Sequence, residues 1–399
     1  MTGIGELTGT VKNYDWGGTS FIPKLLGETQ KADRPEAEYW LGVHPQADCK
    51  VISPDGSTTL LRDYISLDPG QRLGTKVNHD FGNIPYLLKA LDVKDMLSIQ
   101  VHPNKKAAVI DFEREENLGI PLTDPKRNYK DRNHKPELMV AMGEFWLLHG
   151  FKPEDRMNAI LSSVKELNFL QPVFESGSYS GLYEYVMKLQ QAEVNLRLRP
   201  LLDRILPLYK AGKLERSSED FWAARAALTF SETDRGIFSV YLFNVVRTEK
   251  GQAVFQDAGI PHAYLEGWNV EIMASSDNVL RGGLTNKHVD VDELLKHVVC
   301  QPTHPQLLTG ERKGKEIVYK TPAPDFELSG YELEKGEEVI VQPTTAEIFL
   351  LIEGSVTLHS NGSTVDLYPG KPSGIIFPGN EVRILANGNS LLYKASVPA

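Results

Sequence analysis

The stretch Leu97-Ser98-Ile99-Gln100-Val101-His102-Pro103-Asn104-Lys105 combines a strand-like alternation of residue types with two donor side chains. On a β-strand successive side chains point to opposite faces, so Ser98, Gln100 and His102 are predicted to share one face while the aliphatic residues are buried on the other. An imidazole nitrogen and an amide oxygen on one rigid face can bind a divalent metal ion. A metal such as zinc takes about three or four protein ligands, so the others must lie elsewhere in the chain. A surface strand with an ordinary histidine is the alternative interpretation.

Two segments further along the chain supply candidate ligands of the same kind. Glu137 follows Pro136, and the residue before a proline is biased toward an extended conformation. His262 follows Pro261 in a stretch whose glycine and proline predict a tight turn between strands. Nitrogen and oxygen donors without a thiolate suit zinc or another first-row divalent ion better than calcium, and the candidates are Gln100, His102, Glu137 and His262. Spacing alone does not show that they meet, because they are spread over about 160 residues.

The overall composition argues against several classes of protein. The 399 residues carry a formal net charge of −10 and no long basic run, which argues against a nucleic-acid partner. The two cysteines, Cys49 and Cys300, are typical of a reducing compartment and too few for a disulfide framework. The first residues lack the pattern of a signal peptide, and no window approaches the length of about 18 apolar residues that a membrane span needs. We therefore expect a soluble, cytoplasmic protein with no membrane partner.

Changes in residue pattern predict a β domain interrupted by helices. Up to about Gly150, short apolar runs alternate with clusters of glycine, proline, asparagine and aspartate, which is typical of strands and long loops. Between residues 152 and 234, apolar residues recur at intervals of three and four, which indicates helices. Pro200 and Pro207 are expected to start or kink helices in that segment.

The rest of the chain predicts further strands. Strand signals return at residues 238–243, and residues 346–358 predict a strand, a turn and a second strand. Pro-Gly turns follow at residues 367–370 and 377–380, as in a small antiparallel barrel or jelly roll, and His359 is the one histidine of this part. The predicted division is a metal-binding β domain of residues 1–151 and 235–310, a helical domain of residues 152–234, and a C-terminal β domain of residues 311–399 without metal ligands.

Five strings of the sequence resemble the type I mannose-6-phosphate isomerases. They occur in the family's order and at its approximate separations, at residues 37–45 (AEYWLGVHP), 85–89 (PYLLK), 98–105 (SIQVHPNK), 128–138 (NYKDRNHKPEL) and 276–285 (SDNVLRGGLT). The resemblance extends from residues 13–17 to the C-terminal domain. It implies a mainly β fold of cupin (jelly-roll) barrels with an inserted helical domain. It also implies one zinc ion per chain in the first barrel, held by Gln100, His102, Glu137 and His262.

The chain departs from the family pattern in two places. Bacterial relatives usually read AGLTPK where this chain has GGLTNK at residues 282–287, so a proline that would stiffen the turn before Lys287 is missing. The family stretch FEALCGF is here FWLLHGF, at residues 145–151. His149 therefore occupies a position where no catalytic group is expected.

The resemblance implies an aldose–ketose isomerase that interconverts mannose 6-phosphate and fructose 6-phosphate. Such a reaction moves a proton between C1 and C2, and a cation near both oxygens stabilises the enediolate. The resemblance implies Lys135 or Lys89 for proton transfer, with His102 or Asp277 in ring opening, and Glu271 is a further catalytic candidate. A lysine acts as a base only if burial or nearby cations lower its pKa.

Other side chains are candidates for binding the sugar phosphate. The planar guanidinium of Arg281 could bind an enediolate oxygen or the phosphate, and by resemblance Arg281 is essential for activity. Ser98 and Lys89, assisted by Lys287, are candidates for the phosphate end, and Tyr264 and Trp16 are candidates for the walls of the sugar pocket. A monomer is expected. Two alternatives stay open: a metal-dependent isomerase of another aldose, phosphorylated or not, and a non-catalytic sugar-binding cupin.

Overall fold

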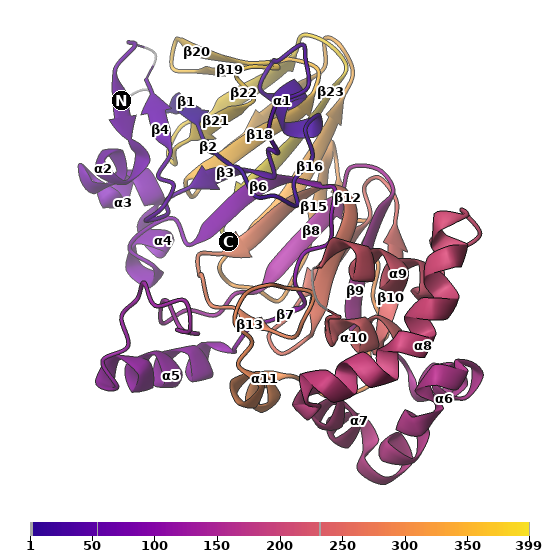
Figure 1. Cartoon of the computed structure of the whole chain (residues 1–399). Helices are drawn as coiled ribbons and strands as arrows, with labels where there is room; N and C mark the ends of the chain where they lie inside the picture. Colours follow the sequence, from indigo (N-terminus) through magenta and orange to yellow (C-terminus); the bar gives the residue numbers. More distant parts are fainter. Residues whose placement is uncertain (1–2, 54, 231–232, 399) are drawn as a thin grey trace.

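The computed structural model describes residues 3–53, 55–230 and 233–398, whose strands pair antiparallel in three sheets (Figure 1). The ten-stranded sheet comprises β2 (Thr10–Lys12), β3 (Glu38–Gly42), β6 (Tyr86–Val93), β7 (Gln100–Val101), β8 (Glu137–Ala141), β9 (Phe145–Phe151), β10 (Phe243–Thr248), β11 (Ala253–Gln256), β12 (His262–Ala274) and β13 (Leu280–Arg281). The nine-stranded sheet comprises β1 (Ile4–Thr8), β4 (Lys50–Ile52), β5 (Thr58–Leu60), β14 (Glu311–Lys313), β15 (Glu316–Tyr319), β16 (Glu327–Leu333), β18 (Glu347–Glu353), β21 (Ser373–Ile376) and β23 (Ser390–Ser396). The four-stranded sheet comprises β17 (Glu338–Val341), β19 (Val356–Ser360), β20 (Ser363–Leu367) and β22 (Val382–Ala386). The predicted fold class, mainly β with helices, is confirmed.

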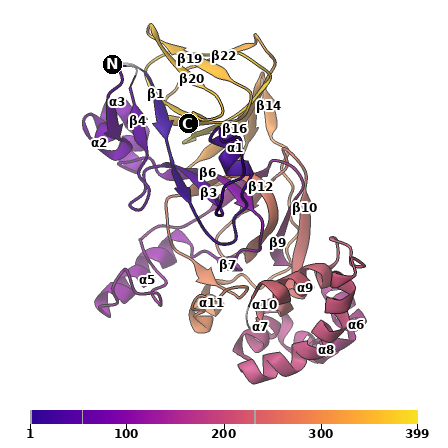
Figure 2. The ribbon, with the colours of Figure 1, turned by 45° about the horizontal axis from the view of Figure 1, so that its top comes forward.

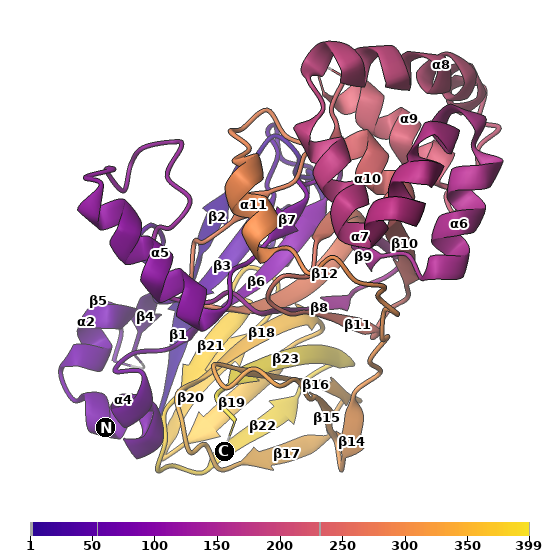
Figure 3. The same cartoon turned by 90° about the horizontal axis from the view of Figure 1, so that it is seen from below.

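Helices occur in two groups. One group forms a block at the end of the molecule opposite the C-terminal strands (Figures 1 and 2): α6 (Glu154–Ser163), the 3₁₀ helix η1 (Lys165–Leu170), α7 (Gln171–Lys188), α8 (Gln191–Lys210), α9 (Glu219–Thr229) and α10 (Gly236–Leu242). The other helices connect strands: α1 (Phe21–Leu25), α2 (Leu61–Ser66), α3 (Pro69–Leu73), α4 (Thr75–Asp80), α5 (Lys105–Asn117) and α11 (Val291–His297). Viewed from below, α11 lies between α5 and the helical block, beside β7 (Figure 3).

The helical block packs against the outer face of the ten-stranded sheet. In β9, Trp146 and Leu148 belong to the same apolar cluster as the buried side chains of the block. Helix α8 buries one stripe of residues at helical spacing: Val194, Leu198, Leu201 and Ile205. Pro200 and Pro207 both lie inside α8, so neither starts a helix as the sequence had suggested it could.

The prediction of a strand over residues 238–243 is wrong for all but its last residue. Helix α10 covers Gly236–Leu242, and β10 begins at Phe243. Every residue of α10 is buried, so this short apolar run has no polar face that would show a helical period. A fully buried strand and a fully buried short helix give the same pattern of residues.

The C-terminal strands follow the predicted cadence. Strands β18 and β19 enclose a turn at Gly354, whose φ of 87° lies in the region that glycine adopts without strain. The turns predicted after residues 367 and 377 lie between β20 and β21 and between β21 and β22. Within residues 311–398, the structure contains no cluster of histidine, cysteine and carboxylate side chains that could hold a metal ion.

The first strand joins the C-terminal part of the chain. β1 pairs with β21 on one side and with β4 on the other, with Ile4 opposite Ile376. Residues near the N-terminus therefore contribute to the nine-stranded sheet as well as to the ten-stranded one. The division of the chain into three domains stays a prediction.

Cys49 is buried, Cys300 is half-buried, and both are free thiols. None of the helices in the described ranges is long and apolar enough to cross a membrane.

Candidate metal centre

The segment from Leu97 to His102 is extended and lies between two strands of the ten-stranded sheet. Only Gln100 and Val101 form a regular strand, β7, which pairs with β12 and β13. The backbone N–H of Leu97 donates to the Tyr264 carbonyl at 2.9 Å and that of Ile99 to the Gly283 carbonyl at 3.0 Å. Ile99 and Val101 are fully buried in the apolar core, which leaves Gln100 and His102 to the other face.

Three of the four predicted metal ligands meet in the interior. Ligand atoms of His102, Glu137 and His262 all lie within 4.8 Å of one another, and the three residues are buried. The Nε2 atom of His102 lies 3.3 Å from Oε1 of Glu137, and the Nε2 atom of His262 lies 3.2 Å from Oε2. Gln100 faces His262 across the β7–β12 pair. Directly opposed residues share a face of the sheet, so the Gln100 side chain is next to this group.

The donor set fits a zinc ion. The Nδ1 atom of His102 lies 2.9 Å from the backbone carbonyl of Asn278, and that of His262 lies 2.9 Å from the carbonyl of Ile260. A carbonyl only accepts, so the proton of each ring is on Nδ1 and the lone pair is on Nε2, toward Glu137. Nε2 of His102 is buried and has no hydrogen-bond partner in the described part of the chain. Burial, and after it the charge of Lys135, lowers the pKa of His102 to about 4, so the ring is neutral as a ligand must be.

Lys135 lies beside the same carboxylate. Its Nζ atom is 2.7 Å from Oε1 of Glu137, and both side chains are buried. Burial alone would raise the pKa of Glu137, but the charge of Lys135 and the contact with His102 lower it well below the usual value. Glu137 is therefore ionised and can act as a ligand.

A second lysine is embedded in a buried ionic network. Nζ of Lys89 lies 2.9 Å from Oε1 of Glu271 and 3.9 Å from Oε2 of Glu38. The Tyr264 hydroxyl donates to the other oxygen of Glu271 at 2.7 Å. Burial lowers the pKa of Lys89, but Glu271 and Glu38 outweigh it, so the pKa is raised and the ammonium stays charged. No feature of the sequence singles out Glu38 as a site residue, although it lies in the family string at residues 37–45.

These groups surround a small cavity of about 60 Å³. Its lining residues are Glu38, Lys89, Leu91, Leu97, Gln100, Lys135, Glu137, His262, Ala263, Tyr264 and Glu271. Pockets that enclose a whole ligand are several times larger, on the order of 300–1,000 Å³. The cavity therefore has room for a metal ion and the reacting atoms of a substrate, while the remainder of the substrate would lie outside it.

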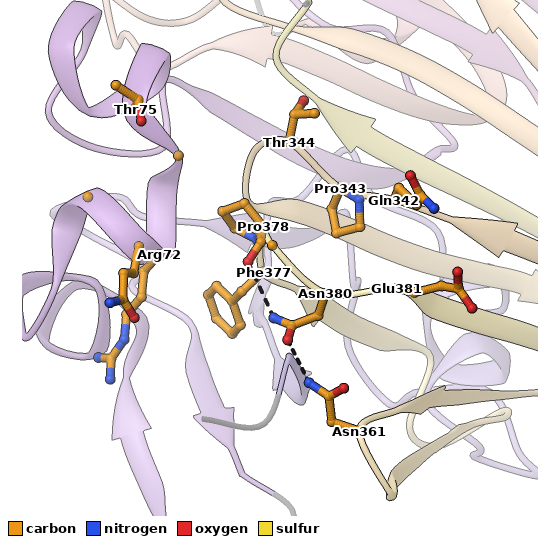
Figure 4. Close-up of a pocket in the computed structure, with 14 residues that line it drawn as sticks. Arg72, Thr75, Gln342, Pro343, Thr344, Asn361, Phe377, Pro378, Asn380 and Glu381 are labelled. Atoms are coloured by element: carbon orange, nitrogen blue, oxygen red, sulfur yellow. Dashed lines mark hydrogen bonds between the residues drawn. The ribbon is translucent and has the colours of Figure 1, made fainter.

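A much larger cavity of about 1030 Å³ lies elsewhere, between helices α3 and α4 and the loops of the C-terminal strands (Figure 4). Arg72 and Thr75 line one wall, and the opposite wall carries Asn361 and Asn380, whose side chains are hydrogen-bonded at 2.6 Å. Its lining includes charged residues only in Arg72 and Glu381, and no histidine, cysteine or lysine of the described chain lines it. Size alone does not make it an active site, because it lacks groups that hold a metal ion or transfer a proton.

Two cations lie on β13 and the turn that follows it, and one of them opposes the predicted ligand Gln100. Arg281 is half-buried and opposes Gln100 across the β7–β13 pair. No carboxylate of the described residues forms an ion pair with Arg281, and burial lowers its pKa. Lys287 is an exposed residue, and its pKa is lowered by partial burial and then by the charge of Arg281. Two neighbouring cations without a carboxylate can bind an anion.

The turn before Lys287 has an anchor that the sequence analysis missed. Asp234 accepts hydrogen bonds from the backbone N–H groups of Leu284 at 2.8 Å and Thr285 at 3.1 Å. Leu284 adopts a positive φ of 53° there. The Asp234 carboxylate thus restrains this turn in a chain that lacks the family's proline.

The other predicted site residues lie outside the small cavity. Asp277 is partly exposed and lies 3.3 Å from Nε2 of the buried His44. Burial alone would raise the pKa of Asp277, but the contact with His44 and the nearby lysines lower it below the usual value. Ser98 is half-buried in the segment that leads to β7, and Trp16 is half-buried and stacks on Tyr14 with ring centroids 5.7 Å apart.

His149 faces the interior but is not part of the metal group. It opposes His262 across the β9–β12 pair, and its Nε2 atom lies 3.2 Å from the Phe255 carbonyl. Burial, followed by the proximity of His262, lowers its pKa to about 4. Its Nδ1 atom is buried without a hydrogen-bond partner among the described residues.

The chain is similar to mannose-6-phosphate isomerases along nearly its whole length. Residues 4–154 match the family model of the phosphomannose isomerase type I catalytic domain. The chain is 34% identical over 396 residues to mannose-6-phosphate isomerase of Escherichia coli K12, which covers 98% of each protein. It is 31% identical to mannose-6-phosphate isomerase of Homo sapiens, with 94% of this chain and 92% of the human protein covered.

Solved structures show the same similarity in three dimensions. A mannose 6-phosphate isomerase bound with zinc and yttrium superimposes with a TM-score of 0.88 at 31% sequence identity, and all of both chains is covered. A zinc-bound form of a mannose 6-phosphate isomerase gives a TM-score of 0.86 at 32% identity over the same coverage.

Proposed function

Since this chain belongs to the type I phosphomannose isomerase family, we propose that it is a zinc-dependent isomerase that interconverts mannose 6-phosphate and fructose 6-phosphate. The observation that carries the proposal is the buried group of His102, Glu137 and His262 next to two lysines. The three residues would hold the metal ion, and the two lysines, which line one cavity with Glu137 and His262, are candidate acid–base groups. A purely structural metal would not need a charged lysine network beside it.

The proposed zinc ligands are Gln100, His102, Glu137 and His262. When bound there, zinc would supply positive charge that stabilises the negative oxygen developing during enolisation. Lys89 adds a second positive charge to the same cavity, and its contacts with Glu271 and Glu38 keep it protonated. The buried position of these groups strengthens their electrostatic effect, because water screens them less.

We assign proton transfer between C1 and C2 to Lys135 rather than to Lys89. Two carboxylates stabilise the charged form of Lys89, so its proton is held tightly. Lys135 lies near one carboxylate, that of Glu137, and lines the cavity. Asp277, held by His44 at the edge of the site, is the proposed group for ring opening.

For the phosphate end we propose Arg281 and Lys287, with the Ser98 hydroxyl nearby. These two cations have no carboxylate partner in the described chain, whereas Lys89 is paired with two. A phosphate dianion next to Glu271 and Glu38 would be repelled, which favours the Arg281 side of the site. Tyr264 lines the cavity and is the proposed wall against the sugar.

The test is a coupled assay of mannose 6-phosphate conversion, with mannose as the comparison substrate. We expect activity with mannose 6-phosphate that disappears after chelation and returns when zinc is restored, together with about one zinc per chain. A folded, zinc-loaded protein that converts neither sugar would contradict the proposal and favour a sugar-binding role. Conversion of mannose alone would point to a different aldose.

A further inference from the structure

Asn278 lies at the junction of the two segments that carry the proposed catalytic groups. It is fully buried and comes three residues before Arg281, in the segment that leads into β13. The second segment, residues 130–137, leads into β8 and carries Lys135 and Glu137. Asn278 does not line the cavity, so it does not touch the reacting atoms itself.

The side chain of Asn278 uses both ends of its amide on the second segment. Oδ1 accepts hydrogen bonds from the backbone N–H groups of Lys130 at 2.7 Å and Asp131 at 3.2 Å. Nδ2 donates to the backbone carbonyls of Asp131 and Asn133, each at 2.8 Å. A buried amide can make about four such bonds, so this one is fully used. The side chain thereby holds the backbone of residues 130–133 in place.

The backbone of the same residue contacts a proposed metal ligand. The carbonyl oxygen of Asn278 accepts from Nδ1 of His102 at 2.9 Å. Such a contact fixes both the tautomer and the orientation of a ligand histidine. Asn278 therefore contacts His102 through its main chain, and through its side chain it contacts residues 130–133, which precede Lys135 and Glu137.

Asp131 locks the two segments from the other direction. Its Oδ2 atom accepts from the backbone N–H of Asp277 at 2.8 Å, and its Oδ1 atom accepts from the Ser276 hydroxyl at 2.9 Å. Oδ1 also accepts from the backbone N–H of Asn133 at 2.8 Å. Neither segment can shift without breaking several bonds of the other.

We infer that Asn278 is a positioning residue that sets the place of His102 relative to Lys135 and Glu137. The inference rests on the proposed metal centre. Loss of the side chain would free residues 130–133 from the segment whose carbonyl holds His102. The result would be a looser metal site even though no ligand is changed. Contacts of this kind affect metal affinity by about 10–100-fold in proteins.

The test compares zinc release from Asn278→Ala and Asn278→Asp with release from the unchanged protein, in excess chelator. The alanine variant loses all hydrogen bonds of the Asn278 side chain, and the aspartate variant turns a carboxylate oxygen toward the carbonyls of Asp131 and Asn133 and toward Oδ1 of Asp131, which repel it. We expect zinc to leave about 10-fold faster or more in both variants. At saturating zinc we expect kcat to fall while KM for mannose 6-phosphate changes little, because Arg281 and Lys287 are unaltered.

Asn244→Ala is the matched control. Asn244 is also buried, and its Nδ2 atom contacts four backbone carbonyls, those of His149, Gly150, Phe151 and Thr303. We expect this variant to lower Tm but to keep the zinc release rate. Asp131→Asn, which keeps the size of the side chain, is expected to speed release in the same direction as the Asn278 variants and provides the test if those do not fold.

Three results would overturn the inference. One is zinc release at the unchanged rate from folded Asn278 variants, or from Asp131→Asn if it alone folds. Another is equal acceleration by Asn244→Ala at an equal loss of Tm, which would mean that any buried amide has this effect. An unchanged protein that takes up no zinc would refute the proposed function and, with it, this inference.

Discussion

At the scale of single residues, the site holds one basic group neutral and another one charged. Burial and the nearby Lys135 keep His102 neutral, while Glu271 and Glu38 keep Lys89 charged. A neutral imidazole is what a metal needs, and a permanent cation is what a developing negative oxygen needs. Both groups are buried, but Lys89 lies between two carboxylates that outweigh its burial, whereas the cation Lys135 adds to the effect of burial on His102. The contacts of Lys89 follow from the positions of β3, β6 and β12 in one sheet.

The assignment of proton transfer to Lys135 can be tested with Lys135→Arg. Arginine keeps the positive charge beside Glu137 but does not give up its proton near neutral pH. We expect kcat to fall by about 10²- to 10⁴-fold, and exchange of the C2 hydrogen with ²H₂O to fall equally, at an unchanged zinc content. Lys89→Met serves as the comparison. If it abolished the exchange while Lys135→Arg kept it, the two roles would have to be reversed.

Acid should destabilise the metal-free protein through its buried histidines. The pKa of His149 is lowered to about 4, mainly by burial, whereas an unfolded histidine titrates near about 6.5. Between these values the unfolded state binds more protons, so stability is full above about pH 6.5 and is lost as the pH falls toward 4. His149→Cys, which restores the residue usual in the family, should reduce this loss by an amount on the order of 3 kcal/mol. Urea unfolding at pH 7 and pH 4.5 measures it, and an unchanged pH dependence in the variant would contradict the prediction.

At the scale of elements, the type of an element could be predicted from the sequence where one of its faces is buried and the other is exposed. Helix α8 buries one stripe and exposes the other, so its period is visible in the sequence. Helix α10 is buried on every side, so its residue pattern predicts a strand as readily as a helix. In the segment around Gln100 only two residues form a regular strand. The segment is nevertheless extended and shows the alternation of a strand, because its N–H groups donate to carbonyls of β12 and of the turn after β13.

The stripe of α8 predicts unequal effects of the same substitution. Leu201 is fully buried, whereas Leu196 on the same helix is 65% exposed. Leu201→Ala should lower the free energy of unfolding by about 2–5 kcal/mol, and Leu196→Ala by less than about 0.5 kcal/mol. Thermal unfolding of both variants checks this. Equal shifts in Tm would mean that α8 does not pack through this stripe.

At the scale of the whole molecule, the residues that the sequence analysis missed are those whose partners lie far along the chain. The predicted ligands His102, Glu137 and His262 do meet. They could be predicted because residue types that bind metals are easy to recognise in a sequence. Glu38, Asn278 and the Asp234 anchor do not stand out by type. Their significance lies in contacts such as that of Asn278 with Lys130, about 150 residues away, which no local pattern shows.

The placement of β1 predicts that a change near the N-terminus weakens the C-terminal part. Leu7 is 2% exposed and packs in the core shared with β18 and β23, whereas Thr8 on the same strand is exposed. Leu7→Ala should lower the free energy of unfolding by about 2–5 kcal/mol and speed protease cleavage within residues 311–398. Thr8→Ala is the control. Cleavage confined to residues near the substitution would contradict the prediction.

The pairing of Ile4 with Ile376 also has a consequence during translation. Strand β1 is synthesised long before β21, the strand that becomes its neighbour in the sheet. At about 5–20 residues per second, the intervening chain takes roughly 20 to 75 seconds to synthesise. During that time the apolar side chains of β1 lack the sheet that will cover them. The sheet around β1 therefore forms only after β21 has been made, and we expect a chaperone that binds nascent chains to shield β1 until then.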